Sequence, residues 1–323
     1  MFSAGDGMLE ERLLDFVSAS PTDEDWEPSQ LLALRLCNHA WRDKAGPAIL
    51  AGCTERLASE DAQVRAAAVS AVAAGSVGRA DKDESSEEAC EAAMAIAAAV
   101  KSLEDTSVDV RRVALRTLAH VAPCGDAFAL EHAIRLLADR AWPVRWAAVD
   151  AVAWLAQGGT KETVVKAFEA LALRLEDVDW PVRRAAAAGL GHVLLFVEAL
   201  AVELQQDGLE DERMPRFEDL QNAIDSATWL VLGLLRDPVT QVRKAALELL
   251  PCFCPGGCEE LTKALCLAAS EVNDLQPIAV TLLGQLSSPG DSKAMAVLEE
   301  LQGQGHVLQA ARDALRELEN RKG

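Results

Sequence analysis

The 323-residue chain contains no tyrosine, and aromatic residues make up only 4% of it. Half of the residues are apolar, with alanine and leucine dominant. Because these two residues favour helix, while β-sheets are enriched in aromatic and β-branched residues, the composition favours helix over sheet. The apolar fraction is also too high for a disordered chain.

Basic residues are few as well. The chain carries 31 Lys and Arg against 51 Asp and Glu, a formal net charge of −20. Such a surface repels the phosphate backbone of nucleic acids and anionic lipid headgroups. No apolar stretch reaches the length that crosses a bilayer, and the amino terminus lacks a basic start followed by an apolar core. We therefore expect a soluble cytoplasmic protein without nucleic-acid or membrane partners, whose protein partner has a basic surface.

The eight cysteines occur without a secretory signal, so no disulfide framework is expected. Cys252, Cys254, Cys258 and Cys266 form the pattern C-x-C-x3-C-x7-C, which is not a usual zinc spacing. Cys252 and Cys266 fall on predicted helices, where cysteine often serves as a small buried hydrophobe. Structural thiols are the favoured interpretation and a metal site is the alternative. No cofactor is predicted.

One short motif recurs seven times along the chain. It begins with Val-Arg at Val64, Val110, Val144, Val182 and Val242, and weaker copies begin at Leu275 and Val307. Counted from this anchor residue, position +4 is always alanine and position +8 is valine or leucine. Positions 0, +4 and +8 form one stripe of an α-helix, and an invariant alanine within it predicts that another helix crosses closely there.

Each motif lies on a predicted helix, called helix B, that follows an amphipathic helix A, as at 129–139 and 258–270. The predicted B helices span 62–74, 108–122, 142–156, 180–206, 240–253, 275–286 and 306–320. A single A–B hairpin cannot bury its own apolar faces, so neighbouring hairpins must stack. The sequence therefore predicts an all-α, right-handed solenoid of about seven hairpins over residues 45–323, after an irregular cap at 1–44.

The turn between helices A and B has a charge pattern of its own. Asp105, Asp139, Asp177 and Asp237 each precede their anchor by five residues, where a carboxylate can accept hydrogen bonds from the free amides that open helix B. The arginines at +1 are Arg65, Arg111, Arg145, Arg183 and Arg243. Stacked repeats would align these arginines beside the aspartates, so we expect a structural ladder of charge-assisted bonds between neighbouring turns.

Sequences such as DVDWPVRRAAAAGLGHV and DTSVDVRRVALRTLAHV resemble HEAT repeats, in particular the short form found in phycobilisome lyases. The resemblance covers about residues 45–320 and implies an armadillo-like superhelix. It says little about activity, because similar repeats occur in scaffolds, adaptors and a few enzymes.

Two acidic inserts interrupt the repeats, at 75–89 and at 207–219, and each joins a B helix to the next A helix. The simple interpretation is a solvated loop. The functional interpretation is an acidic edge for a basic partner, which includes Glu210, Asp211 and Glu212. Neither insert has the spacing of an EF-hand.

A second departure is a column at position +10 of three successive B helices, formed by His120, Trp154 and His192. Stacking is expected to bring the three side chains near one another on the inner face. Half-buried packing is the favoured interpretation, and partner, metal or base roles are the alternatives. Trp142 and Trp180, each just before Pro-Val-Arg, are expected to cover the A–B turn.

Two families of enzymes resemble this chain in repeat type. Deoxyhypusine hydroxylase resembles this chain in repeat type and uses His-Glu dipeptides for its di-iron site, but no histidine here is followed by glutamate. Phycobilisome lyases act on bilins, and only the His120, Trp154 and His192 column could line the apolar groove they need. The favoured function is a non-catalytic protein-binding scaffold. The alternative is a lyase-like or chaperone-like HEAT enzyme acting on a protein substrate.

Overall fold

The computed structural model describes residues 56–76, 86–207, 217–253, 259–270, 275–303, 305 and 307–321. In these ranges every regular element is a helix, and no strand occurs. The predicted all-α helical-repeat fold is therefore confirmed. The predicted cap at 1–44 lies outside the described residues.

The seven B helices lie within two residues of their predicted bounds. They are α4 (Ala62–Ser76), α6 (Val108–Val121), α8 (Trp142–Leu155), α10 (Trp180–Asp207), α12 (Thr240–Phe253), α14 (Gln276–Leu286) and α16 (Leu308–Asn320). The A helices are α5 (Ser86–Ser102), α7 (Ala127–Leu136), α9 (Lys161–Ala172), α11 (Phe217–Leu234), α13 (Glu259–Ser270) and α15 (Ser292–Leu301). A short 3-10 helix, η1 (Leu173–Glu176), extends α9.

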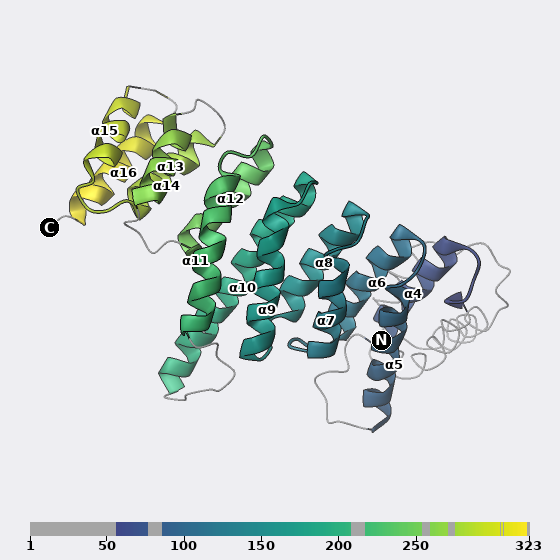
Figure 1. Cartoon of the computed structure of the whole chain (residues 1–323). Helices are drawn as coiled ribbons and strands as arrows, with labels where there is room; N and C mark the ends of the chain where they lie inside the picture. The colour runs from purple at the N-terminus through teal and green to yellow at the C-terminus, as the bar shows by residue number, and fades with distance from the viewer. Residues whose placement is uncertain are drawn as a thin grey trace, which may run out of the picture. The chain divides into compact units, whose positions relative to one another are not determined.

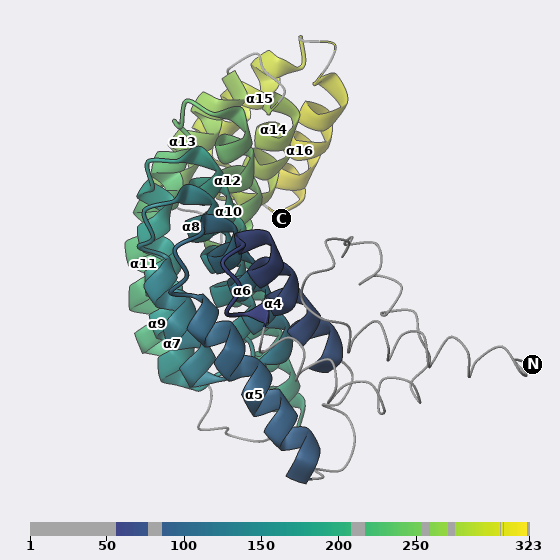
Figure 2. The same cartoon turned by 90° about the vertical axis from the view of Figure 1, so that its right-hand side faces the viewer.

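The chain divides into two compact units, residues 1–158 and 159–323. In the first unit α6 lies between α4 and α8, while α5 packs on α6 and α7 on α8 (Figures 1 and 2). In the second unit α10 packs on α12 and α14 on α16, with each A helix beside its own B helix. Stacking of neighbouring hairpins thus buries the apolar faces that one hairpin alone would expose.

The apolar stripe of the motif forms the core. In α6 the anchor Val110, the +4 residue Ala114 and the +8 residue Leu118 are all at most 1% exposed. The corresponding residues of α8 and α10 are fully buried: Val144, Ala148, Val152, Val182, Ala186 and Leu190. The alanine at +4 leaves room for the neighbouring B helix, which explains why no larger residue takes its place.

No helix in the part of the chain that the structure describes is long and apolar enough to span a membrane.

Candidate functional site

The aspartate of each A–B turn holds the turn together before helix B begins. Its carboxylate accepts a hydrogen bond from the backbone N–H two residues later in the chain. Ser107 donates to Asp105 at 2.8 Å, and Ala141 donates to Asp139 at 2.8 Å. The two later turns repeat this contact, Asp177 with Asp179 at 3.0 Å and Asp237 with Val239 at 2.8 Å. Ser107 and Ala141 are the N-cap residues of α6 and α8. The carboxylate therefore fixes the residue that precedes the helix, as in an Asx-turn.

The arginine at +1 binds backbone carbonyl groups of the same turn. Its Nη1 donates to a backbone carbonyl six residues back in all five repeats: Arg65 to Ser59, Arg111 to Asp105, Arg145 to Asp139 and Arg183 to Asp177, each at 2.8 Å, and Arg243 to Asp237 at 2.7 Å. This shared contact gives every guanidinium the same orientation relative to its turn.

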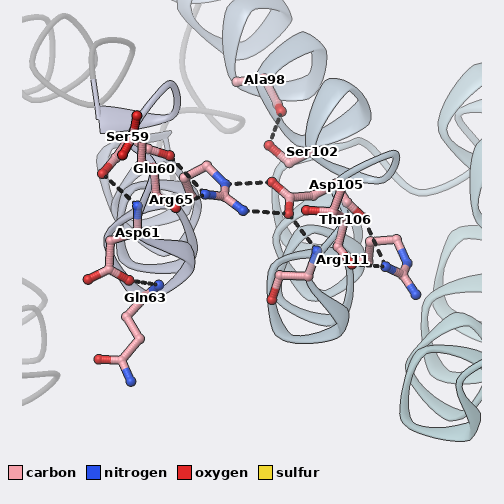
Figure 3. Close-up of polar contacts among 11 residues, drawn as sticks. Ser59, Glu60, Asp61, Gln63, Arg65, Ala98, Ser102, Asp105, Thr106 and Arg111 are labelled. Carbon is pink, nitrogen blue, oxygen red and sulfur yellow. Dashed lines mark hydrogen bonds and ion pairs between the residues drawn. The ribbon is translucent and has the colours of Figure 1, made fainter.

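The opposite edge of the guanidinium reaches the next repeat. Arg65 donates from Nε and Nη2 to the two carboxylate oxygens of Asp105, at 2.7 and 2.8 Å (Figure 3). Arg111 contacts Asp139 in the same way at 2.8 and 2.9 Å, and Arg183 contacts Asp237 at 2.7 and 3.0 Å. Each arginine thus joins the carbonyls of its own turn to the carboxylate of the following turn. Bidentate geometry makes such contacts stronger than a single ion pair.

These contacts change the acidity of the aspartates. The hydrogen bond from Arg65 holds the pKa of Asp105 below its usual value, against the opposing effect of burial. Burial raises the pKa of Asp139, but the hydrogen bonds from Arg111 and from the Ala141 amide outweigh it and leave that pKa low. Both carboxyl groups are therefore ionised at neutral pH.

Of the predicted ladder residues, Arg145 belongs to the first unit and Asp177 to the second. Arg243, the last of the series, differs from the others. Its Nη2 donates to the Thr240 hydroxyl at 3.1 Å, and its Nε is buried without a hydrogen-bond partner in the described residues.

The residues at +10 are exposed, so the expected half-burial is wrong. His120 and His192 are exposed, and Trp154 is 51% exposed. His120 turns back onto its own helix, with Nδ1 2.9 Å from the Arg116 carbonyl. Position +10 continues the solvent-facing row at +2 and +6 rather than the buried stripe at +4 and +8, which explains the error. His120 and Trp154 lie on α6 and α8, which pack together, and His192 lies in the second unit.

The side chains at +2, +6 and +10 form a solvent-facing row on α6 and on α8 that the repeat motif alone did not predict. On α6 it comprises Arg112, Arg116 and His120, and on α8 it comprises Trp146, Asp150 and Trp154. We call these six residues the α6–α8 row. The Arg116 guanidinium lies over the Trp146 ring, 5.5 Å from its centre, a cation–π distance. Arg116 is at +6 of its helix and Trp146 at +2, so the packing of α6 against α8 brings different motif positions into contact.

The remaining candidate residues are the acidic residues of the second insert, the cysteines and two tryptophans. Glu210, Asp211 and Glu212 lie outside the described residues, as do Cys254 and Cys258. Cys252 and Cys266 are both partly buried, and burial raises the pKa of the Cys266 thiol. Within the described ranges no three metal-ligating side chains come together. Trp142 and Trp180 are 43% and 40% exposed at the starts of α8 and α10.

Comparison with known proteins agrees with this architecture. Residues 96–191 match the sequence profile described as HEAT repeats. No curated protein sequence matches the chain significantly. The structure resembles that of the E. coli protein YibA, with 14% identity over 98% of each chain and a TM-score of 0.53.

Weaker structural similarities also involve repeat or engineered proteins. A designed armadillo repeat protein is 23% identical over 82% of this chain and 98% of its own, with a TM-score of 0.45. An engineered protein is 21% identical over 84% of this chain and 97% of its own, with a TM-score of 0.47. The profile match places HEAT repeats at residues 96–191, and the resemblance to YibA shows a similar fold.

Proposed function

We propose that this HEAT-repeat chain is a non-catalytic scaffold that binds a protein partner on the exposed side of its B helices. The observation that carries this proposal is the exposure of Trp154 and His120 on two packed B helices. A large indole half-exposed to water on a regular helix is costly to solvate, and tryptophan is among the residues that contribute most to protein interfaces.

The α6–α8 row offers more than one kind of contact. Arg116 and Trp146 already hold each other through the 5.5 Å cation–π contact, which limits their side-chain freedom before a partner arrives. Arg112 is held by Asp109 at 3.0 Å, and Trp154 provides apolar area. Preordered side chains lose less entropy on binding, so this row suits recognition of a folded or extended polypeptide.

The net charge supports the choice of partner. With a formal charge of −20, the chain attracts basic proteins at long range, and we propose that the acidic inserts at 75–89 and 207–219 provide much of that attraction. In this proposal the charge accelerates encounter, whereas the α6–α8 row supplies short-range contact. The two contributions differ in their dependence on salt, because screening weakens only the first strongly.

Affinity capture with three forms of the chain tests the proposal. Wild type and Trp229→Ala should retain the same partner, whereas His120→Ala/Trp154→Ala should lose it. Trp229 is the matched control because it is 66% exposed but lies on the A helix α11. Equal retention by all three forms would show that the α6–α8 row does not bind the partner.

A further inference from the structure

Among the described residues, the last arginine–aspartate contact between neighbouring turns is that of Arg183 with Asp237. In the two following repeats the positions of the turn aspartate hold Ser270 and Gln302, and the positions of the arginine hold Gln276 and Leu308. Ser270 donates its hydroxyl to the Cys266 carbonyl in its own helix, at 2.8 Å. Gln276 is fully buried and donates to the Ala269 carbonyl at 2.8 Å.

Helix packing changes at the same place. Before and after this place, neighbouring hairpins pack through both their A helices and their B helices. Helix α9 packs on α11 and α10 on α12, and likewise α13 packs on α15 and α14 on α16. Between α12 and α14 the contact is far less extensive than between the other neighbouring B helices of the unit, and α11 and α13 make no comparable contact. The buried, unpaired Nε of Arg243 lies on α12 beside this boundary. A buried donor without a hydrogen-bond partner lowers stability, and the described arginine–aspartate contacts between neighbouring turns, each of which we call a rung, contain no such donor.

Helices α13 to α16 are joined to one another by a different set of contacts. Lys293 of α15 pairs with Glu259 of α13 at 3.1 Å. Arg321, just after α16, donates from Nη1 to the Gln285 carbonyl at 2.7 Å and from Nη2 to the Gly284 carbonyl, at the C-terminal end of α14. A Cβ at Gly284 would stand only 2.6 Å from the Cβ of Ala314, so α14 and α16 touch almost backbone to backbone. Figure 2 shows these four helices gathered together.

We propose that α13–α16 is a separate cooperative body and that the boundary between α12 and α14 is a joint at which it moves or opens. In a repeat array, cooperativity passes only through the interfaces between neighbours. Where one interface is weak, the segments on either side open independently. The joint is therefore a conformational device of the fold that does not depend on which partner the chain binds.

Hydrogen exchange measured on the full chain tests the proposal. Gly284→Ala places a methyl group against Ala314 and should raise the exchange rates of α13–α16 amides by at least about tenfold. The amides of α9–α12 should keep wild-type rates. Gly233→Ala is the matched control, since no atom lies within 4 Å of a Cβ there, and it should accelerate exchange in neither segment. Equal loss of protection in α9–α12 and α13–α16 would overturn the proposal.

The reverse perturbation covers the case in which Gly284→Ala unfolds α13–α16 entirely. Arg183→Gln removes the rung between α10 and α12 and should accelerate exchange there. A separate body predicts unchanged rates in α13–α16. If exchange in α13–α16 rises together with that in α10–α12, the boundary transmits cooperativity and is not a joint.

Discussion

Arg111 on α6 binds Asp139 in the following turn through two hydrogen bonds of 2.8 and 2.9 Å, while its third nitrogen binds the carbonyl of Asp105 in its own turn at 2.8 Å. One side chain therefore fixes both the shape of a turn and the distance to the next. Because the contact recurs for Arg65 and Arg183, the aspartate and the arginine of the Asp-x4-Val-Arg pattern serve architecture rather than partner recognition.

Removing this contact should destabilise the first unit. The Arg111 and Asp139 side chains are only 6% and 10% exposed, so Asp139→Asn leaves a buried guanidinium without its charge partner. We expect a loss of about 2–4 kcal/mol, between the values for surface and buried pairs. Urea denaturation followed through the first unit measures it.

The matched control is Asp109→Asn, which breaks the neighbouring Arg112 pair. Asp109 is 73% exposed, so this change should cost less than about 0.5 kcal/mol. Similar losses for Asp109→Asn and Asp139→Asn would mean that the turn-to-turn contact adds nothing beyond a surface ion pair.

The ladder should also make stability depend on pH in the acid range. The pKa values of Asp105 and Asp139 are lowered in the folded protein, so the unfolded chain binds more protons. Their contribution is complete above the unfolded value, about pH 3.9, and is lost as pH falls through the lower folded values. The urea midpoint of wild type should therefore fall steeply below about pH 4. Asp105→Asn/Asp139→Asn should show a flatter profile, and parallel profiles would contradict this account.

The core of the second unit offers an independent test of packing. Phe168 of α9 is fully buried and stacks on Phe253 of α12, with ring centres 5.9 Å apart. Phe168→Ala should cost about 3–5 kcal/mol, whereas Phe168→Leu, which retains most of the volume, should cost less than about 1.5 kcal/mol. Chemical denaturation of the second unit gives both values. A small loss for Phe168→Ala would show that the ring is not part of the folded core.

Neutralising the acidic inserts should weaken association through its rate. Replacing Glu210, Asp211 and Glu212 with their amides should lower the association rate constant of the partner several-fold at low salt and leave dissociation nearly unchanged. At high salt the wild type should approach the variant. The same three changes made at the exposed Glu299, Glu300 and Asp313 are the control for total charge. Equal effects of the two sets would attribute steering to net charge instead of to the inserts.

Much of the architecture was predictable from the sequence, for a physical reason. An alanine at +4 and a leucine or valine at +8 mark the helix face that must be buried, so the B helices were located within two residues. Stacking of the repeats also predicts bonds between neighbouring turns, and Arg111 does pair with Asp139 of the following turn. The repeat pattern did not indicate that the same guanidinium also donates to the Asp105 carbonyl in its own turn.

The exposed side chains were harder to interpret. Position +10 continues the solvent-facing row at +2 and +6, but it also borders the buried stripe, and that proximity led to the wrong expectation of half-burial for Trp154. The Arg116–Trp146 contact joins position +6 of one helix to +2 of the next, an offset set by how α6 and α8 pack. Side-chain roles at such boundaries depend on interhelical geometry, which a repeat pattern does not contain.

The central claim, that the α6–α8 row binds a protein partner, is tested most directly by the dissociation constant of the captured partner for three purified variants. Trp154→Ala should weaken binding by about 2 kcal/mol, roughly thirtyfold, as expected for a tryptophan at the centre of an interface. Trp229→Ala, on helix α11, should bind like wild type. An unchanged dissociation constant for Trp154→Ala, with the fold intact by circular dichroism, would contradict the account.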